Sequence, residues 1–336
     1  MKTAELGKTG EVISRIGLGC MLMGSTIGKT ESFSILDYYL EKGGNFLDTA
    51  NCYAWWIGKG EFIGNESEEL LGQWFKERGN REKVFLATKV GARLRDPHNI
   101  RDKDGNPLWD KVRGEYEYLS PAVIRKGVED SLKRLGTDYI DLYYAHIDDR
   151  NTPIEVIMET FNRLKEEGKI KHIGCSNFRT WRLERAQSVG RYNNRTSFCA
   201  IQQQCSYLRP KAGADFGVGV NIDQELTDYL KSNDDVSLVG YSPLLKGIYD
   251  DKAKREACYI WPLFNTEDNR IRLETLSKMA AELGVGNNQL VLAWLLHLEP
   301  AVFPLVGVSR FAQIEPNLRA ADISLSGEQM AILNNA

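Results

Sequence analysis

The feature that most constrains the fold of this chain is an eightfold alternation of two sequence patterns. Short, largely apolar runs rich in β-branched and aromatic residues alternate with segments whose apolar residues recur at helical spacing. Strands that are apolar on both faces are typical of parallel sheets covered by helices. Eight strand–helix units in 336 residues predict a single (β/α)8 TIM barrel. The strand-like runs lie at residues 15–20, 45–48, 83–90, 139–146, 170–176, 197–204, 236–243 and 301–309.

A doubly wound parallel sheet is the main alternative to the barrel. It requires a glycine-rich phosphate loop after an early strand, and "GLGCMLMG" at residues 17–24 does not match GxGxxG. Residues 1–17 read as a β-hairpin before the first barrel strand. No linker or repeat divides the chain, so we expect one domain over residues 1–336. Two irregular stretches, 91–119 and 244–270, are expected to form long functional loops at the C-terminal face of the barrel.

Helix-end signals support this division into elements. Ser120 is the expected N-cap of a helix whose first position is Pro121, and Gly136 is expected to end that helix. For the helix that begins near residue 66, Asn65 or Ser67 is the expected cap.

Composition and charge exclude several classes of function. The chain is 42% hydrophobic and 26% charged with a net charge of −3, which gives no reason to expect nucleic acid or a membrane surface as a partner. The first ten residues have no apolar stretch, so we expect no secretory signal, and no apolar run is long enough to span a bilayer. Six scattered cysteines without a CxxC pair favour free thiols in a cytoplasmic protein. Four histidines without metal-ligand spacing predict no metal site.

Polar residues stand at the ends of seven of the eight strand-like runs. The carboxyl ends of all barrel strands meet at one mouth, where active sites lie, so these residues are expected to become neighbours. Any one of them alone would more often cap the following helix. The residues are Asp48, Lys89, His146, Ser176–Asn177, Gln202–Gln204, Tyr241–Ser242 and Ser309–Arg310, and Tyr53 lies just past the second run.

Four of these side chains make a coherent proton-transfer device. Tyr53 is a weak acid, and a nearby Lys89 ammonium is expected to favour its phenolate and lower its pKa. Asp48 would hold Lys89 charged and in place, and a neutral His146 could donate a hydrogen bond to a carbonyl oxygen. This set suits reduction of a C=O group, in which hydride reaches carbon and the phenol protonates oxygen.

At these residues the chain resembles the aldo-keto reductase superfamily, essentially from end to end. "NFLDTANCY", "FLATKVG" and "SLKRLGTDYIDLYYAHIDD" resemble segments that carry the catalytic tetrad of that family. The resemblance implies that Asp48, Tyr53, Lys89 and His146 are catalytic. It also implies a nicotinamide cofactor, with hydride transfer between a carbonyl and an alcohol.

Further motifs imply the cofactor contacts. In "GKIKHIGCSNF" and "QQQCSYL", Ser176, Asn177 and Gln202 should hold the nicotinamide carboxamide. In "GYSPL", Tyr241 should stack on the nicotinamide ring, while Ser242 and Leu244 line the pyrophosphate path. In "PLVGVSRFAQIEPNL", Ser309 and Arg310 should bind a 2′-phosphate, and Gln313 and Asn317 should contact the adenine side. Because the Arg310 guanidinium suits a phosphate, we predict NADP(H) rather than NAD(H).

Three departures from the family pattern limit what can be carried over. The segment after the tyrosine, "YAWWIGKGEFIGNESEE", is longer and more aromatic than the usual short glycine-rich loop. Gln204 stands where the family commonly has glutamate. We also expect no long C-terminal loop over the substrate pocket.

The substrate is expected to be a small polar carbonyl compound such as a keto-sugar, an aldose or an inosose. Trp55, Trp56 and Trp109 are the candidate substrate contacts, and aromatic faces mixed with charged groups suit sugars. The same residues would suit an aromatic or aliphatic aldehyde.

Two other functions stay open. One is a redox-sensing auxiliary subunit that holds cofactor with little turnover, and the other is a metal-dependent barrel isomerase or hydrolase. The sequence says nothing of oligomeric partners.

Overall fold

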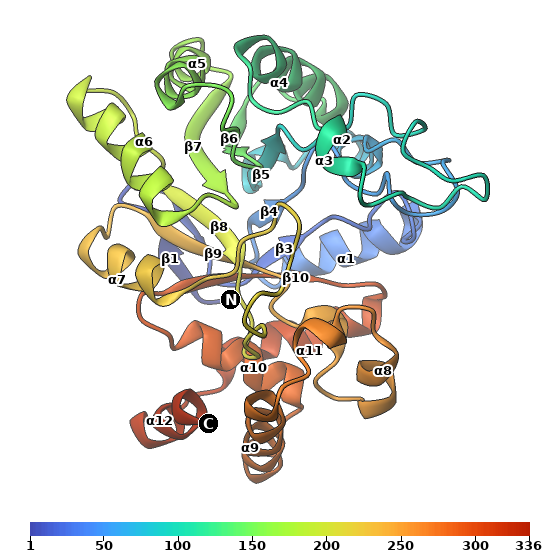
Figure 1. Ribbon diagram of the computed structural model, residues 1–336, viewed down its shortest axis with the longest axis vertical. Coiled ribbons are helices and arrows are strands. Elements are labelled where there is room, and N and C mark those ends of the chain that lie inside the picture. The colour runs from blue at the N-terminus through green and yellow to red at the C-terminus, as the bar shows by residue number, and fades with distance from the viewer.

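The computed structural model describes residues 1–336 and contains a closed barrel of eight parallel strands (Figure 1). Each strand pairs with the next along the chain, and β10 closes the barrel on β3. This confirms the predicted (β/α)8 barrel and excludes the doubly wound sheet. The barrel strands are β3 (Gly17–Gly19), β4 (Phe46–Asp48), β5 (Phe85–Val90), β6 (Ile140–Ala145), β7 (Ile170–Ser176), β8 (Ala200–Gln204), β9 (Ser237–Tyr241) and β10 (Val302–Gly307).

Helices surround the strands on the outside of the barrel, as Figure 1 shows. The helices that follow successive barrel strands are α1 (Lys29–Glu41), α2 (Glu66–Arg78), α4 (Pro121–Leu135), α5 (Ile154–Glu166), α6 (Thr180–Tyr192), α7 (Gln224–Ser232), α9 (Glu267–Leu283) with α10 (Asn287–Leu296), and α11 (Ile314–Arg319). The remaining helices are α3 (Val112–Glu115), α8 (Lys252–Ala257), α12 (Gly327–Asn335) and the short 3-10 helices η1 (Arg81–Lys83), η2 (Leu245–Gly247), η3 (Trp261–Leu263), η4 (Phe311–Gln313) and η5 (Ala320–Asp322).

Local sequence signals place the ends of α4 and the start of α2, but only α4 has the expected capping hydrogen bond. Ser120 accepts a hydrogen bond from Val123 N at the start of α4, and Gly136 ends the helix in the left-handed conformation, both as predicted. Asn65 occupies the N-cap position of α2, one of the two predicted caps, but its side chain makes no capping hydrogen bond, and Ser67 lies inside the helix. The Asn65 side chain instead accepts a hydrogen bond from Arg93, a partner that lies 28 residues away in sequence.

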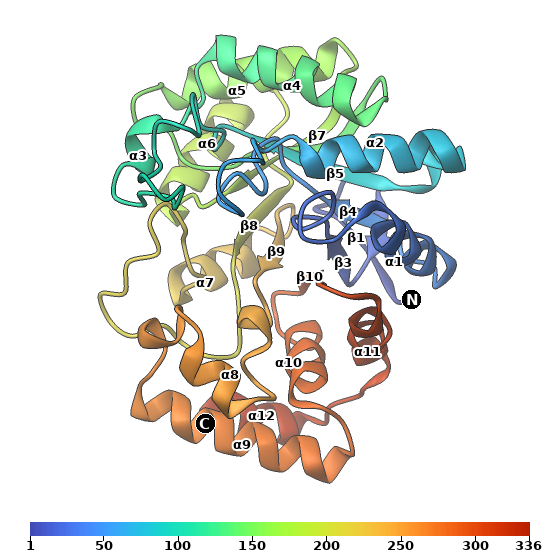
Figure 2. The same cartoon turned by 90° about the vertical axis from the view of Figure 1, so that its right-hand side faces the viewer.

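An antiparallel hairpin of β1 (Thr3–Glu5) and β2 (Val12–Ser14) precedes the barrel, as predicted. Leu6 and Ile13 of the hairpin pack in one apolar cluster with Phe46 and Phe85, which begin strands β4 and β5. The hairpin therefore covers the amino ends of the strands and leaves the carboxyl ends for the long loops. Figure 2 shows the hairpin and the loop that carries α3 on opposite sides of the barrel. No helix combines the length and the apolar character needed to cross a membrane.

Candidate active site at the carboxyl ends of the strands

Asp48, Lys89 and Tyr53 meet at the mouth of the barrel. Lys89 Nζ lies 2.5 Å from Asp48 Oδ1 and donates to Tyr53 Oη over 2.7 Å and to the carbonyl oxygen of Thr49 over 2.7 Å. Asp48 ends β4 and Lys89 lies in the adjacent strand β5, so strand pairing brings the acid and the ammonium together. The turn after β4 then carries Tyr53 back over the ammonium. The sequence-based grouping of these three side chains is thus reproduced in space.

The ion pair within this cluster is completely buried. Asp48 is 2% exposed and Lys89 is 0% exposed. Gln202 Nε2 donates to the second carboxylate oxygen of Asp48 over 2.9 Å, so both oxygens are satisfied. A buried ion pair persists only when its remaining hydrogen-bonding groups have partners, because each charge has lost its hydration. The mouth of the barrel therefore holds a preformed and fixed ammonium beneath the phenol.

The phenol of Tyr53 is protonated at neutral pH. Its ring is partly accessible from the mouth, but its hydroxyl lies over the buried ion pair. Burial and the Asp48 carboxylate hold the pKa of Tyr53 well above its usual range. We expected the Lys89 ammonium to lower that pKa, and the shift has the opposite direction because desolvation of the phenolate dominates. A protonated phenol that is hydrogen-bonded to an ammonium can donate a proton to an incoming oxygen.

His146 completes the group. It follows β6, and its ring lies 5.9 Å from the ring of Tyr53 at an interplanar angle of 83°. Burial and the Lys89 ammonium hold the pKa of the imidazole well below its usual range, so the ring is neutral. His146 Nδ1 contacts Cys52 Sγ at 3.5 Å. A neutral imidazole beside the phenol agrees with the sequence-based expectation of a hydrogen-bond donor.

Ser176, Asn177 and Gln202 lie together beside the tetrad residues. Ser176 Oγ donates to Gln202 O over 2.8 Å, and Asn177 Nδ2 donates to Ser176 Oγ over 3.1 Å and to His146 O over 3.0 Å. Asn177 Oδ1 accepts from Tyr241 Oη over 2.9 Å. The same oxygen accepts from the amide N–H of Val220 over 3.0 Å, which occupies all four hydrogen-bonding positions of the Asn177 side chain. Binding of a carboxamide by Asn177 therefore requires exchange of one of these partners.

The backbone after β9 is strained where the sequence predicts the pyrophosphate path. Ser242, Leu245 and Lys246 have φ angles of 53°, 44° and 62°, a region that side-chain-bearing residues rarely adopt. Such strain collects at ligand-binding segments, and successive residues of this kind turn backbone N–H groups toward an anion. Leu244 lies between Ser242 and Leu245 in this turn and is the N-cap of η2. Lys246 was not among the predicted contacts, and a lysine in the otherwise small and apolar "SPLLKG" is the signal that could have indicated it.

The region that follows β10 is exposed, unlike the tetrad. Ser309 donates from both its N–H and its hydroxyl to Gln313 Oε1, over 2.7 and 3.1 Å, and Asn317 is buried in α11. Arg310 is exposed and has no ion-pair partner in the chain. The amide N–H of Phe311 donates to the Glu31 carboxylate of α1 over 2.8 Å. The Glu31 carboxylate thus lies beside the predicted 2′-phosphate contacts. Sequence analysis did not identify Glu31, because it is remote from Arg310 in the chain.

These placements fit a dinucleotide along the mouth. Arg310 carries a guanidinium without an ion-pair partner, the backbone after β9 is strained, and a buried amide cluster lies next to the tetrad. Groups of these kinds suit phosphate and carboxamide. Arg310, Ser242 and Gln202 are therefore residues that would hold a nicotinamide dinucleotide.

The three candidate tryptophans occupy different positions. Trp55 is 3% exposed and packs with Leu94 and Ile100 in a small cluster of its own. Trp56 is partly buried, and its ring lies 6.4 Å from that of Tyr53 at an angle of 82°. Trp109 is 61% exposed and contacts Trp55 at 5.5 Å between ring centroids. Trp56 is thus the tryptophan next to the phenol, whereas Trp55 supports it from beneath.

The loop at residues 91–119 is more regular than its sequence indicates. Leu94 and Tyr116 form an antiparallel bridge, and Arg95 donates to the carbonyl oxygens of Gly114 and Tyr116. Arg101 donates to the carbonyl oxygen of Trp55 and ties this loop to the segment after Tyr53. These guanidinium groups hold loop backbone, so they leave fewer charged groups for a substrate than the sequence indicates.

A second loop over the mouth, residues 206–222, escaped sequence analysis. Val218 packs with Tyr53 and Cys52, and Val220 bonds to Asn177 as described. Arg113 of α3 donates to Gly217 O over 2.8 Å, so the loops after β5 and β8 touch each other. The segment contains three glycines and a proline and shows no helix or strand period, which made it resemble a simple connection.

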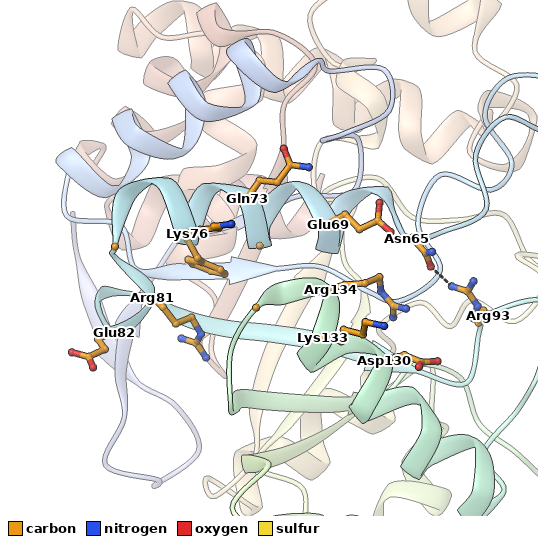
Figure 3. Close-up of a pocket in the computed structure, with 14 residues that line it drawn as sticks. Asn65, Glu69, Gln73, Lys76, Arg81, Glu82, Arg93, Asp130, Lys133 and Arg134 are labelled. Atoms are coloured by element: carbon orange, nitrogen blue, oxygen red, sulfur yellow. Dashed lines mark hydrogen bonds between the residues drawn. The ribbon is translucent and has the colours of Figure 1, made fainter.

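A pocket of about 1010 Å³ lies elsewhere, on the outer wall between α2 and α4 (Figure 3). Its guanidinium groups are already engaged. Arg134 pairs with the buried Glu68, Arg81 pairs with Asp141, and Arg93 binds Asn65. No group of three or more His, Cys, Asp or Glu side chains is placed to hold a metal ion. The barrel mouth therefore remains the candidate active site.

The chain is similar to known proteins over nearly its whole length. The aldo/keto reductase family model matches residues 15–336. The chain is 33% identical to the uncharacterized oxidoreductase YrpG of Bacillus subtilis, over 100% of this chain and 95% of that protein. It is 30% identical to norsolorinic acid reductase stcV of Emericella nidulans, over 95% of this chain and 76% of the relative. It is 29% identical to an NADP(+) aryl-alcohol dehydrogenase of Phanerodontia chrysosporium, over 96% of this chain and 82% of that protein.

A solved structure shows the same fold over the same length. The thermostable aldo-keto reductase Tm1743, crystallised with the inhibitor epalrestat, superposes with a TM-score of 0.70 at 28% identity, covering 100% of this chain and 99% of that one. The barrel, the strand-end residues and the matched family agree over nearly the whole sequence. The chain is an oxidoreductase and belongs to the aldo/keto reductase family.

Proposed function

We propose that this protein reduces a carbonyl compound to an alcohol with NADPH, and that Tyr53 is the proton donor. The observation that supports this most strongly is the protonated Tyr53 hydroxyl, held 2.7 Å from the buried Lys89 ammonium. The bound nicotinamide supplies the hydride that reaches the carbonyl carbon. As negative charge develops on the substrate oxygen, Tyr53 transfers its proton, and Lys89 stabilises the phenolate that remains. His146 orients the oxygen from the other side.

The preference for NADP(H) rests on Arg310. Its exposed guanidinium offers a planar pair of donors that matches a 2′-phosphate. The relative from Phanerodontia chrysosporium carries NADP(+) in its name. The cytoplasmic location expected from the sequence is in keeping with six free cysteines and stays a prediction.

For the substrate, we infer a carbonyl compound with a flat apolar face, with aryl ketones and aldehydes as the first class to test. Trp56 stands beside Tyr53, and Arg95 and Arg101 are occupied by loop carbonyls. The names of two relatives include norsolorinic acid and aryl alcohol, which supports the same class. The keto-sugar, aldose or inosose expected from the sequence stays a prediction, because sugars also stack on tryptophan.

A substrate panel tests this proposal. NADPH consumption is measured with aryl ketones, aryl aldehydes, aldoses, keto-sugars and inososes at equal concentrations. We expect the highest kcat/KM with an aryl carbonyl. A preference for an aldose or an inosose would reverse the choice of substrate class, and no turnover of any carbonyl would favour the auxiliary-subunit function and contradict the proposal. A chelator control should leave the rate unchanged, which would exclude a metal-dependent reaction.

A further inference from the structure

We propose that Cys52 is a positioning residue that fixes the tautomer of His146. In this arrangement the Cys52 thiol donates its S–H to His146 Nδ1, so that Nε2 keeps the proton and presents it to the substrate carbonyl oxygen. The inference rests on the proposed carbonyl reduction for its consequence, but the contact itself can be tested without turnover. Cys52 lies in the "NCY" segment that also delivers the phenol, so one short turn would set both proton-bearing groups.

The geometry brings the sulfur and the ring nitrogen together and holds both. Cys52 Sγ lies 3.5 Å from His146 Nδ1, within the range of a hydrogen bond that involves sulfur. Cys52 is 3% exposed and packs with Ala50, Ala92 and Ile147. Gly64 closes the other side, because a Cβ there would lie 2.9 Å from the Cα atom of Cys52. The Cys52 backbone is therefore closely packed at this point, and its side chain is buried next to the imidazole.

The ring of His146 is anchored through its backbone. Its N–H donates to Val90 O over 2.9 Å, and its carbonyl oxygen accepts from Asn177 Nδ2 over 3.0 Å. These bonds hold the backbone of His146 but do not determine which ring nitrogen carries the proton. The only side-chain partner of either ring nitrogen in the chain is Cys52.

The protonation states of the two groups allow the thiol to donate the hydrogen bond. Burial raises the pKa of the Cys52 thiol to about 12, against the opposing effect of Lys89 and Arg93, so the sulfur carries its proton at neutral pH. The imidazole is neutral, because burial and Lys89 lower its pKa. A neutral imidazole has one donor and one acceptor nitrogen. With an S–H donor at Nδ1, that nitrogen is the acceptor and Nε2 carries the hydrogen.

This choice matters for a carbonyl oxygen bound at the mouth. With hydrogen on Nε2, the oxygen can receive one hydrogen bond from His146 and one from Tyr53. With hydrogen on Nδ1, the lone pair of Nε2 would face the lone pairs of the substrate oxygen, and a buried polar contact would be lost. Replacing the thiol with a group that cannot donate should therefore cost about fivefold in kcat, the effect of one neutral hydrogen bond.

The experiment compares Cys52→Ala, which has no donor, with Cys52→Ser, which keeps one. Long-range proton–nitrogen NMR spectra of 15N-histidine-labelled protein distinguish protonated from unprotonated ring nitrogens, and a His146→Gln spectrum assigns the signals of His146 among the four histidines. Cys199→Ala, which removes a buried thiol near the hairpin end of the barrel, is the control. NADPH affinity and kcat for an aryl ketone are measured on the same samples.

We expect an unprotonated Nδ1 in the wild type and in Cys52→Ser, and a mixture of tautomers in Cys52→Ala with an approximately fivefold lower kcat. NADPH affinity should be unchanged in all variants, and Cys199→Ala should match the wild type. A protonated Nδ1 in the wild type, or an identical tautomer in Cys52→Ala, would overturn the inference. If the tautomer responds to Cys52 while no carbonyl is reduced, the contact stands and the proposed function fails.

Discussion

The two ends of the proposed cofactor path differ in how completely they are built. At the reacting end, Asp48, Lys89 and Tyr53 are linked by short hydrogen bonds and the ion pair is buried. At the adenosine end, Arg310 is exposed and unpaired and stands near a carboxylate of another helix. The difference indicates that the proton-transfer groups are fixed before a ligand binds, whereas the groups proposed to bind the adenosine phosphate gain their partners only on binding. Substitutions at the two ends should therefore fail in different ways.

The largest effect is expected for Tyr53→Phe. Loss of the proton donor should lower kcat by about 1000-fold, because general acid catalysis typically contributes that much. NADPH binding, followed by fluorescence titration, should stay within about twofold of the wild type, since the phenol is not among the proposed cofactor contacts. Loss of NADPH binding in Tyr53→Phe would mean that the residue is structural.

Breaking the buried ion pair should cost stability at the reacting end. Lys89→Met leaves the Asp48 carboxylate buried without its ammonium, and the free energy of unfolding should fall by about 3 kcal/mol at pH 8 in urea titrations. The double variant Lys89→Met/Asp48→Asn should recover part of that loss, because no unpaired charge remains. Equal stability of the single and double variants would argue that the pair is not the source of the effect.

The adenosine end should respond in affinity and not in stability. Arg310→Ala should raise the dissociation constant for NADPH about tenfold or more relative to NADH, as expected for loss of a charged hydrogen bond. Its free energy of unfolding should stay within about 0.5 kcal/mol of the wild type, because the side chain is exposed. An unchanged ratio of NADPH to NADH affinity would refute the assignment of Arg310 to the 2′-phosphate.

A smaller change in NADPH affinity, in the opposite direction, is expected for Glu31→Gln. Its carboxylate accepts the Phe311 N–H beside Arg310, where it repels a phosphate group. Removing the charge should tighten NADPH by about threefold, an effect of the size seen for partly screened charges at a surface. Glu41→Gln, the same substitution at the other end of α1, is the matched control and should change neither affinity.

The sequence predicts the barrel because each strand and helix carries its own local pattern. Ser120 and Gly136 delimit α4 by capping chemistry that needs no distant partner. The acid, lysine, phenol and imidazole were found because the carboxyl ends of parallel strands must converge. These features depend on residues close together in the chain or on the symmetry of the fold.

The features that the sequence did not predict depend on contacts between segments that are remote in the chain. Asn65 is the N-cap residue of α2, but its side-chain oxygen accepts from Arg93 and makes no capping bond. The high pKa of Tyr53 follows from desolvation, which only the folded mouth reveals, whereas the sequence suggested the influence of Lys89 alone. Trp55 and Trp56 are adjacent in sequence, yet loop packing buries one and leaves the other beside the phenol. None of these outcomes has a local sequence signal.

The central claim is that hydride moves from a nicotinamide to a carbonyl carbon while Tyr53 protonates the oxygen. It is tested most directly by a reduction with NADPH deuterated at the transferred position of C4, followed by mass spectrometry of the alcohol. We predict one deuterium on the carbinol carbon of each product molecule for the wild type, and about 1000-fold slower formation of that labelled alcohol for Tyr53→Phe with NADPH bound. Alcohol without deuterium, or equal labelled product from Tyr53→Phe, would contradict the account.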